Sequence, residues 1–182
     1  MIDSSSQPAG SLSGFMLKTA DIFESIILKV SAVCCYSSAL LIAVIICNVT
    51  MRYGFNNGLI LFEEIQWHLY AIGIMFGLSY AEITNSQVRV DVVASMLKPK
   101  TVIKWEIFGA VIFVFPTIFV ILFNSFDYVA NSYLLGESSS SPLGMPFRWL
   151  IKSAIPASFI LLAMAVLARL FRNIITLTQK EA

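Results

Sequence analysis

The chain has 182 residues, of which 58% are hydrophobic and only 13% are charged. Soluble domains average roughly 45–50% apolar and about 25% charged residues, so this composition predicts an integral membrane protein. The net charge of +1 argues against nucleic acid as a partner, because nucleic-acid binding calls for a concentrated basic surface.

The N-terminal region divides into two parts. Residues 1–14 are rich in serine, contain Asp3, and lack the basic and apolar regions of a secretory signal peptide. We expect them to form a disordered tail before a single four-helix membrane domain over residues 15–182. From Phe15 to Ile27, apolar side chains recur at helical spacing, opposite a polar face. This pattern predicts an amphipathic helix that lies at the membrane interface.

Four later segments carry no formal charge, namely residues 30–51, 65–81, 107–126 and 153–168. At roughly 1.5 Å per residue, helices of these lengths approach the ~30 Å hydrocarbon thickness of a bilayer. Continuous apolar runs favour helices over the strands of a membrane barrel, in which apolar and polar residues alternate. The predicted fold class is therefore all-α integral membrane, with four transmembrane helices and the interfacial helix.

Two prolines fall within or beside these spans. Pro116 is expected to kink the third span, because proline removes a backbone donor and clashes with the preceding turn. Pro156 is expected in the first turns of the fourth span, where proline costs less.

The distribution of Lys and Arg predicts the orientation in the membrane. The N-terminal arm, the second loop and the C-terminal tail carry nine of these residues, against three in the first and third loops. Positive charge accumulates on the cytoplasmic side of membrane proteins, so both termini are expected in the cytoplasm. This orientation would place Glu63 and Glu64 at the outer surface and Arg89 and Asp91 at the inner surface.

Polar residues at the ends of the first two spans are candidates for structural or subunit contacts. Asn48 and Arg52 lie one turn apart at the end of the first span, and Glu63 and Glu64 precede the second. We expect Arg52 to bridge to one carboxylate and close the hairpin between the spans. The alternative is that one carboxylate pairs with another subunit or with lipid headgroups.

Gly73, Gly77 and Ala81 recur every fourth residue in the second span. Small residues at this spacing let another backbone approach closely, so they predict a packed helix contact with a neighbour inside or outside the chain. After a serine-rich loop, Arg148 and Trp149 are expected to form an interfacial anchor.

No catalytic, cofactor-binding or metal site is predicted. His68 is the only histidine, whereas a membrane haem anchor normally needs two axial histidines and a di-iron bundle needs Glu-x-x-His motifs. The apolar segments also lack the mid-membrane ionisable groups of a proton relay. The sequence therefore predicts a protein that is not an enzyme and holds no cofactor.

The order of several short motifs resembles the small membrane subunit of tripartite ATP-independent periplasmic (TRAP) transporters, roughly from Leu40 to Arg169. The motifs are Asn48-x-x-x-Arg52-Tyr53, Phe62-Glu63-Glu64-Ile65, Val88-Arg89-Val90-Asp91 and Pro142-x-Gly-x-Pro146-x-Arg148-Trp149. One departure is Asn85-Ser86-Gln87, where many relatives carry a Gly-His type turn.

The resemblance implies a multi-pass protein in a three-component complex of the bacterial inner membrane. A periplasmic binding protein captures an organic acid, and a large membrane subunit carries the substrate and sodium sites. This chain would be a scaffold subunit in contact with the large subunit and with membrane lipids. Its expected interface or structural residues are Asn48, Arg52, Glu63, Glu64, Gly73, Gly77, Arg89, Asp91, Arg148 and Trp149. Two alternatives stay open, the membrane anchor of a respiratory oxidoreductase and a small homo-oligomeric exporter.

Overall fold

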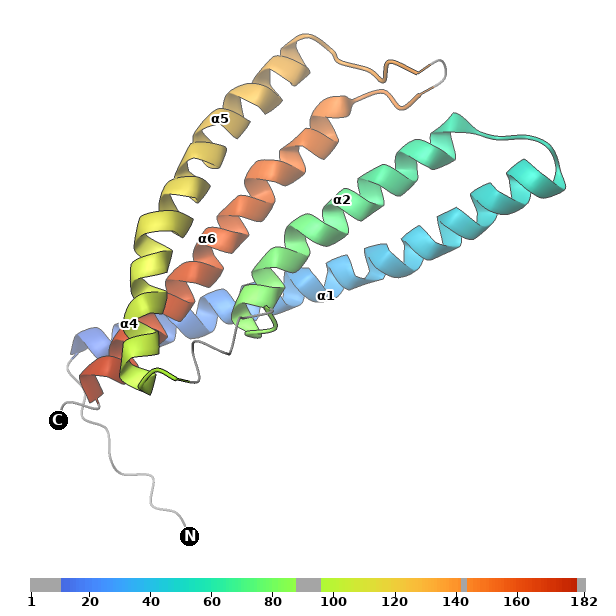
Figure 1. The fold of residues 1–182 in the computed structure, drawn as a ribbon. Coiled ribbons are helices and arrows are strands. Elements are labelled where there is room, and N and C mark those ends of the chain that lie inside the picture. Colours follow the sequence, from blue (N-terminus) through green and yellow to red (C-terminus); the bar gives the residue numbers. More distant parts are fainter. Residues whose placement is uncertain (1–10, 88–95, 142–143, 180–182) are drawn as a thin grey trace.

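The computed structural model describes residues 11–87, 96–141 and 144–179, and these residues are helical apart from short connections (Figure 1). The helices are α1 (Ser11–Gly54), α2 (Ile60–Ile83), α4 (Pro99–Gly109), the π-helix η1 (Ala110–Val114), α5 (Phe115–Leu134) and α6 (Arg148–Gln179). No strand occurs in these ranges. The prediction of an all-helical fold is confirmed.

The helices form an open row and not a closed bundle. Figure 1 shows α5, α6, α2 and α1 side by side in that order, and α1 also contacts α6. α6 is the central helix, because it packs against α1, α2, α4 and α5. Its side chains Ala165, Val166 and Ala168 are buried, and the two alanines let neighbouring helices approach closely.

α1 joins two elements that were predicted as separate. The expected interfacial helix and the first span form one unbroken helix of 44 residues. Such a helix is about 66 Å long at 1.5 Å per residue, more than twice the ~30 Å hydrocarbon thickness. No Gly or Pro lies between Phe15 and Tyr53 to end the helix earlier. α1 also begins at Ser11, inside the segment expected to be a tail, and residues 1–10 lie outside the described residues.

Three of the described helical stretches are long and apolar enough to cross a membrane, Ser13–Gly54, Pro99–Leu134 and Arg148–Thr178. They contain the first, third and fourth predicted spans. The second predicted span lies in α2, which has 24 residues and packs against α1 and α6 but is not one of these three. Near its start α2 carries four polar residues, Glu63, Glu64, Gln66 and His68.

The two prolines occupy different helical positions, and the position of Pro156 differs from the prediction. Pro116 is the second residue of α5, directly after the π-helix Ala110–Val114. The wider π turn makes room for the proline ring, which would otherwise clash with the carbonyl four residues earlier. Pro116 is thus accompanied by a π-helix at the point where a kink was expected. The placement of Pro156 in the first turns was wrong. α6 begins already at Arg148, so Pro156 lies buried in the helix interior.

Candidate functional site

Polar side chains gather at the two ends of the helix row and tie its helices together. The α1–α2 connection and the α5–α6 connection lie at one end, and the start of α1, the end of α2 and the end of α6 lie at the other (Figure 1). We call the first group the loop cluster, which contains Arg52, Glu63, Glu64, Ser139 and Met145 with Glu137 and Lys152. We call the second group the terminal cluster, which contains Asp21, Glu24, Glu82, Glu106, Arg169 and Arg172.

Arg52 and Glu63 close the hairpin between α1 and α2. Arg52 Nη1 lies 3.2 Å from Glu63 Oε1, and the two side chains are 60% and 48% exposed. The expected bridge across this hairpin is therefore present. An ion pair this exposed contributes only about 0–1 kcal/mol to stability.

Glu64 takes a different partner, although it is adjacent to Glu63. The backbone N–H of Met145 donates to Glu64 Oε2 at 2.5 Å, and the Ser139 hydroxyl donates to the other carboxylate oxygen. Both donors belong to the loop between α5 and α6. Glu64 thus joins the α1–α2 hairpin to the α5–α6 hairpin inside one chain, an arrangement that the sequence did not predict.

Gly144 lets this loop reach Glu64. A Cβ added at Gly144 would lie 2.7 Å from Glu64 Oε1 and would also overlap the side chain of Ser139. Real Cβ atoms do not approach other heavy atoms this closely, so a side chain at this position would push the loop away.

A second set of contacts fixes the same loop to α5 and α6. The Ser132 hydroxyl donates to Glu137 Oε2 at 2.7 Å, and the Lys152 ammonium forms an ion pair with the same oxygen. Lys152 Nζ also lies 3.9 Å from the centroid of the Tyr128 ring. The hydrogen bond from Lys152, followed by that from Ser132, lowers the pKa of the Glu137 carboxyl below its usual value.

A pocket of about 300 Å³ lies between α2 and this loop, and its walls include Trp67, His68 and Arg148. His68 Nδ1 lies 2.5 Å from the backbone carbonyl oxygen of Glu64, which accepts a hydrogen bond when Nδ1 carries the ring proton. Within the described ranges, no three His, Cys, Asp or Glu side chains come together as metal ligands. The arrangement is suited to holding a loop in place.

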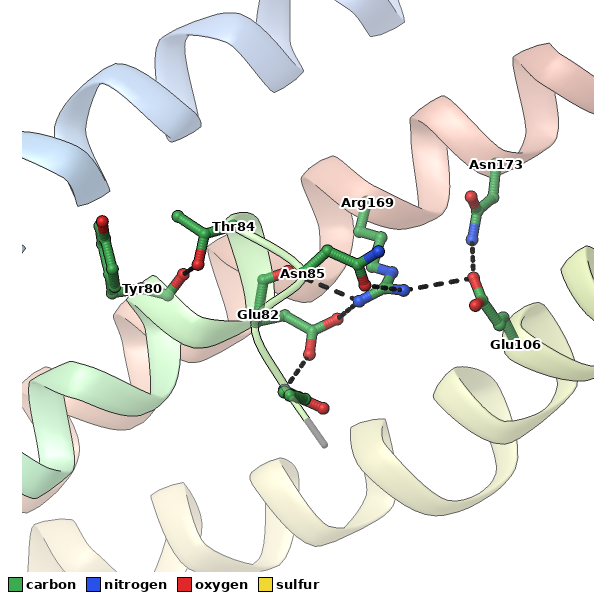
Figure 2. A network of polar contacts seen from close by, with 8 residues as sticks. Tyr80, Glu82, Thr84, Asn85, Glu106, Arg169 and Asn173 are labelled. Carbon is green, nitrogen blue, oxygen red and sulfur yellow. Dashed lines mark hydrogen bonds and ion pairs between the residues drawn. The ribbon is translucent and has the colours of Figure 1, made fainter. Parts of the chain in front are cut away.

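At the other end, Arg169 of α6 lies between carboxylates of two other helices (Figure 2). Its guanidinium is 3.1 Å from Glu82 Oε1 at the end of α2 and 3.4 Å from Glu106 Oε2 in α4. It also donates to Asn85 Oδ1 at 3.0 Å. The three charged side chains are only 14–24% exposed. One arginine thus links α2, α4 and α6.

A more exposed pair of contacts brings α1 into the terminal cluster. Arg172 Nη2 lies 2.9 Å from Asp21 Oδ1 and 2.7 Å from Glu24 Oε2. Arg172 follows Arg169 by about one turn of α6. The last turns of α6 therefore bind the first half of α1 as well as α2 and α4.

The small-residue register in α2 does not form one continuous contact. A Cβ at Gly73 would meet the Ser37 hydroxyl oxygen of α1 at 3.4 Å, so Gly73 packs inside the chain. A Cβ at Gly77 would meet no described atom within 4 Å. The prediction of close packing holds for Gly73 against α1, and Gly77 lies beside open space.

The remaining predicted residues are placed as follows. Asn48 is 7% exposed, and no described residue bonds its side-chain oxygen. Trp149 packs edge-on against Tyr133, with ring centroids 5.5 Å apart. Arg148 is exposed and lines the pocket. Arg89 and Asp91 lie outside the described residues.

The family model for tripartite ATP-independent periplasmic transporters, DctQ component, matches residues 41–176. The chain belongs to this family. It is a TRAP transporter component with membrane-spanning helices, as the motif order had indicated. The family is one of transporter components and not of enzymes. Comparison with curated proteins returns no match.

The structure accounts for Asn85, one of three residues at which the sequence departs from the expected Gly-His type turn. Asn85 follows the last turn of α2 with a φ of 56°, in the left-handed region that glycine adopts most easily. Asparagine tolerates this conformation better than other residues with a Cβ. Its side chain also accepts the hydrogen bond from Arg169, which glycine could not do.

Sequence reasoning missed the terminal cluster. Arg169 was counted among the positive charges that predict the orientation but was not a predicted site residue. Glu82 and Glu106 were not predicted site residues either. A signal was available, because Glu82 and Arg169 each directly follow an uncharged segment. Pairing them required the knowledge that α2 and α6 run side by side.

Proposed function

We propose that this chain is the small, non-catalytic scaffold subunit of a sodium-coupled TRAP transporter that imports an organic acid. Family membership supports the assignment to a transporter complex. In such a complex, a periplasmic binding protein delivers the acid and a large membrane subunit moves it. The scaffold role is supported by the polar clusters, which tie the same helices at both ends.

The scaffold role rests on one observation. α2 is linked at one end to the loop that precedes α6 and at the other end to α6 itself. Glu64 binds the α5–α6 loop at one end, and Glu82 binds Arg169 at the other. A subunit that itself alternated between two states would have to break one set of contacts in each cycle. A buried charge that is left without its partner costs about 3–5 kcal/mol, which favours one stable arrangement.

We further propose that all four predicted spans cross the bacterial inner membrane, with both termini in the cytoplasm. α2 would be the second span, since its 24 residues reach about 36 Å at 1.5 Å per residue. The loop cluster would then lie at the periplasmic surface. The excess of Lys and Arg in the N-terminal arm, second loop and tail supports this orientation.

Within this proposal, the expected interface residues divide into two groups. Glu64 and Gly73 stabilise the subunit itself, because their contacts lie within the chain. Gly77 and Arg148 are available to a partner, since Gly77 borders open space and Arg148 is exposed. The oxidoreductase anchor is not favoured, because the chain has one histidine and the family is a transporter family.

Co-purification tests the proposed function. A tagged chain is co-expressed with the large membrane subunit of its own transporter, extracted in mild detergent and captured. We expect the large subunit to be recovered in a fixed ratio with the tagged chain. Its absence from the captured material, with both proteins present in the membrane, would contradict the proposal.

A further inference from the structure

α5 is packed on one side only. Among its buried residues are Ile118, Ser125 and Ser132, which recur every seventh position and face α6, the helix that α5 contacts most. Seven residues make nearly two turns, so these three side chains form one stripe along the helix. The rest of the α5 surface is largely exposed.

The exposed surface of α5 consists of two different stripes on either side of the buried one. Each buried residue is preceded by a polar residue, and Thr117, Asn124 and Asn131 are all exposed. Each is followed by an aromatic residue, and these three are also exposed, namely Phe119, Phe126 and Tyr133. Neighbouring helical residues diverge by roughly 100°, so the two stripes lie on opposite flanks of the α6 contact.

The aromatic side chains can face lipid hydrocarbon, but the polar side chains would lack hydrogen-bond partners there. Asn124 lies in the uncharged segment 107–126, and its Nδ2 donates to the Val120 carbonyl at 2.7 Å. A side-chain amide has a second N–H and an oxygen with two lone pairs, and no residue of the described chain bonds that oxygen. Lipid tails offer no hydrogen-bonding group to complete it.

Thr117 and Asn131 extend the same flank. The Thr117 hydroxyl donates to the Phe113 carbonyl at 2.7 Å, which leaves its oxygen free to accept a hydrogen bond from outside the chain. Asn131 lies two turns beyond Asn124, toward the loop end of α5. A helix packed along this flank would meet a polar group at every second turn.

We propose that the stripe Thr117, Asn124 and Asn131 docks a transmembrane helix of the large subunit that presents hydrogen-bonding side chains. This inference rests on the proposed function, which supplies a membrane-embedded partner. Hydrogen-bond complementarity selects a protein helix over lipid, because polar side chains bond between helices inside membranes. α5 lies at the edge of the helix row, so the partner displaces no helix of this chain.

Capture of the large subunit tests the stripe directly. Asn124→Leu removes the amide and keeps a similar volume, and Phe126→Leu is the matched control on the other flank. We expect Asn124→Leu to lower recovery of the large subunit roughly three- to tenfold, and Phe126→Leu to leave it unchanged. Asn124→Gln, which restores an amide, should recover most of the loss. Equal recovery with the two leucine variants would overturn the inference.

Photo-cross-linking gives a second readout that leaves the polar side chains in place. A photoreactive residue at Val120, one turn from both Thr117 and Asn124, should cross-link to the large subunit. The same residue at Phe119 should not. Adducts from Phe119 alone, adducts to a second copy of this chain, or no protein adduct from Val120 would overturn the inference. Failure of the unaltered chain to capture the large subunit would instead contradict the proposed function.

Discussion

The Glu64 carboxylate of α2 accepts a hydrogen bond from the backbone N–H of Met145, 81 residues later in the chain, at 2.5 Å. Its neighbour Glu63 faces Arg52 on the preceding helix. Two adjacent carboxylates therefore hold two different connections. Glu63 closes one helical hairpin, and Glu64 joins that hairpin to the next.

Glu64→Ala is expected to lower the melting temperature of the purified chain in detergent more than Glu63→Ala does. Glu64→Ala leaves the Met145 N–H and the Ser139 hydroxyl without their acceptor, and a lost partner in a half-buried contact costs more than an exposed ion pair. Thermal unfolding followed by circular dichroism checks the order. A larger loss with Glu63→Ala would contradict the assignment of roles.

Gly144→Ala should destabilise the chain by about 1–3 kcal/mol, because the added Cβ would overlap Glu64 and Ser139. Gly109→Ala is the matched control, since its Cβ would meet nothing within 4 Å. Alanine also favours helices, so Gly109→Ala should be neutral or stabilising. Equal melting temperatures of the two variants would mean that the loop does not press against Glu64.

Arg169→Ala should be far more destabilising than Arg172→Ala. The first change removes the cation between two mostly buried carboxylates, which costs about 3–5 kcal/mol, and the second removes exposed contacts worth about 0–1 kcal/mol each. Protease resistance of membrane-embedded protein, compared at matched expression, provides the readout. Similar resistance of both variants would show that Arg169 does not link the helices.

The Glu137 contacts predict a loss of stability in acid. Since the folded-state pKa of Glu137 is lowered, its contribution is fully present above its ordinary pKa, about 4.3, and is lost as the pH falls through the folded value. Melting temperatures measured from pH 6 to pH 3 should therefore fall more steeply for the unaltered chain than for Glu137→Gln. Parallel pH profiles would argue against a coupled carboxylate at this position.

Gly73→Leu and Gly77→Leu should have different effects on the isolated chain. Leucine at residue 73 would displace Ser37 of α1 and cost about 1–3 kcal/mol, whereas leucine at residue 77 would extend into open space. Gly77→Leu should therefore leave the melting temperature of the chain unchanged. If the large subunit covers this surface, as the proposed function suggests, Gly77→Leu should lower its capture more than Leu78→Ala does.

The helices themselves could be predicted from the sequence because long uncharged segments leave few other solutions in a membrane. The continuity of α1 from the expected interfacial helix into the first span could not be predicted. The residues near Ile27 and Lys29 favour helix equally on both sides, so the change from interfacial to apolar composition does not break the backbone. Pro156 was misplaced for a related reason, since the Arg148 anchor begins a helix and does not end a loop.

The polar contacts also differ in whether the sequence alone predicts them. Arg52 and Glu63 are separated by a short connection, so their pairing follows from the hairpin alone. The partner of Glu64 depends on which helix packs beside α2, and local patterns carry no information on that order. Once α6 is known to lie there, both the Glu64 contact and the Arg169 contact become explicable.

Reconstitution tests most directly whether this chain is a scaffold that moves no solute. The purified chain, the large subunit, or both together are placed in liposomes with an inward sodium gradient, the cognate binding protein and a labelled organic acid. We expect saturable, sodium-dependent uptake only when both membrane subunits are present. Saturable uptake of the acid by liposomes that contain this chain alone would contradict the scaffold assignment.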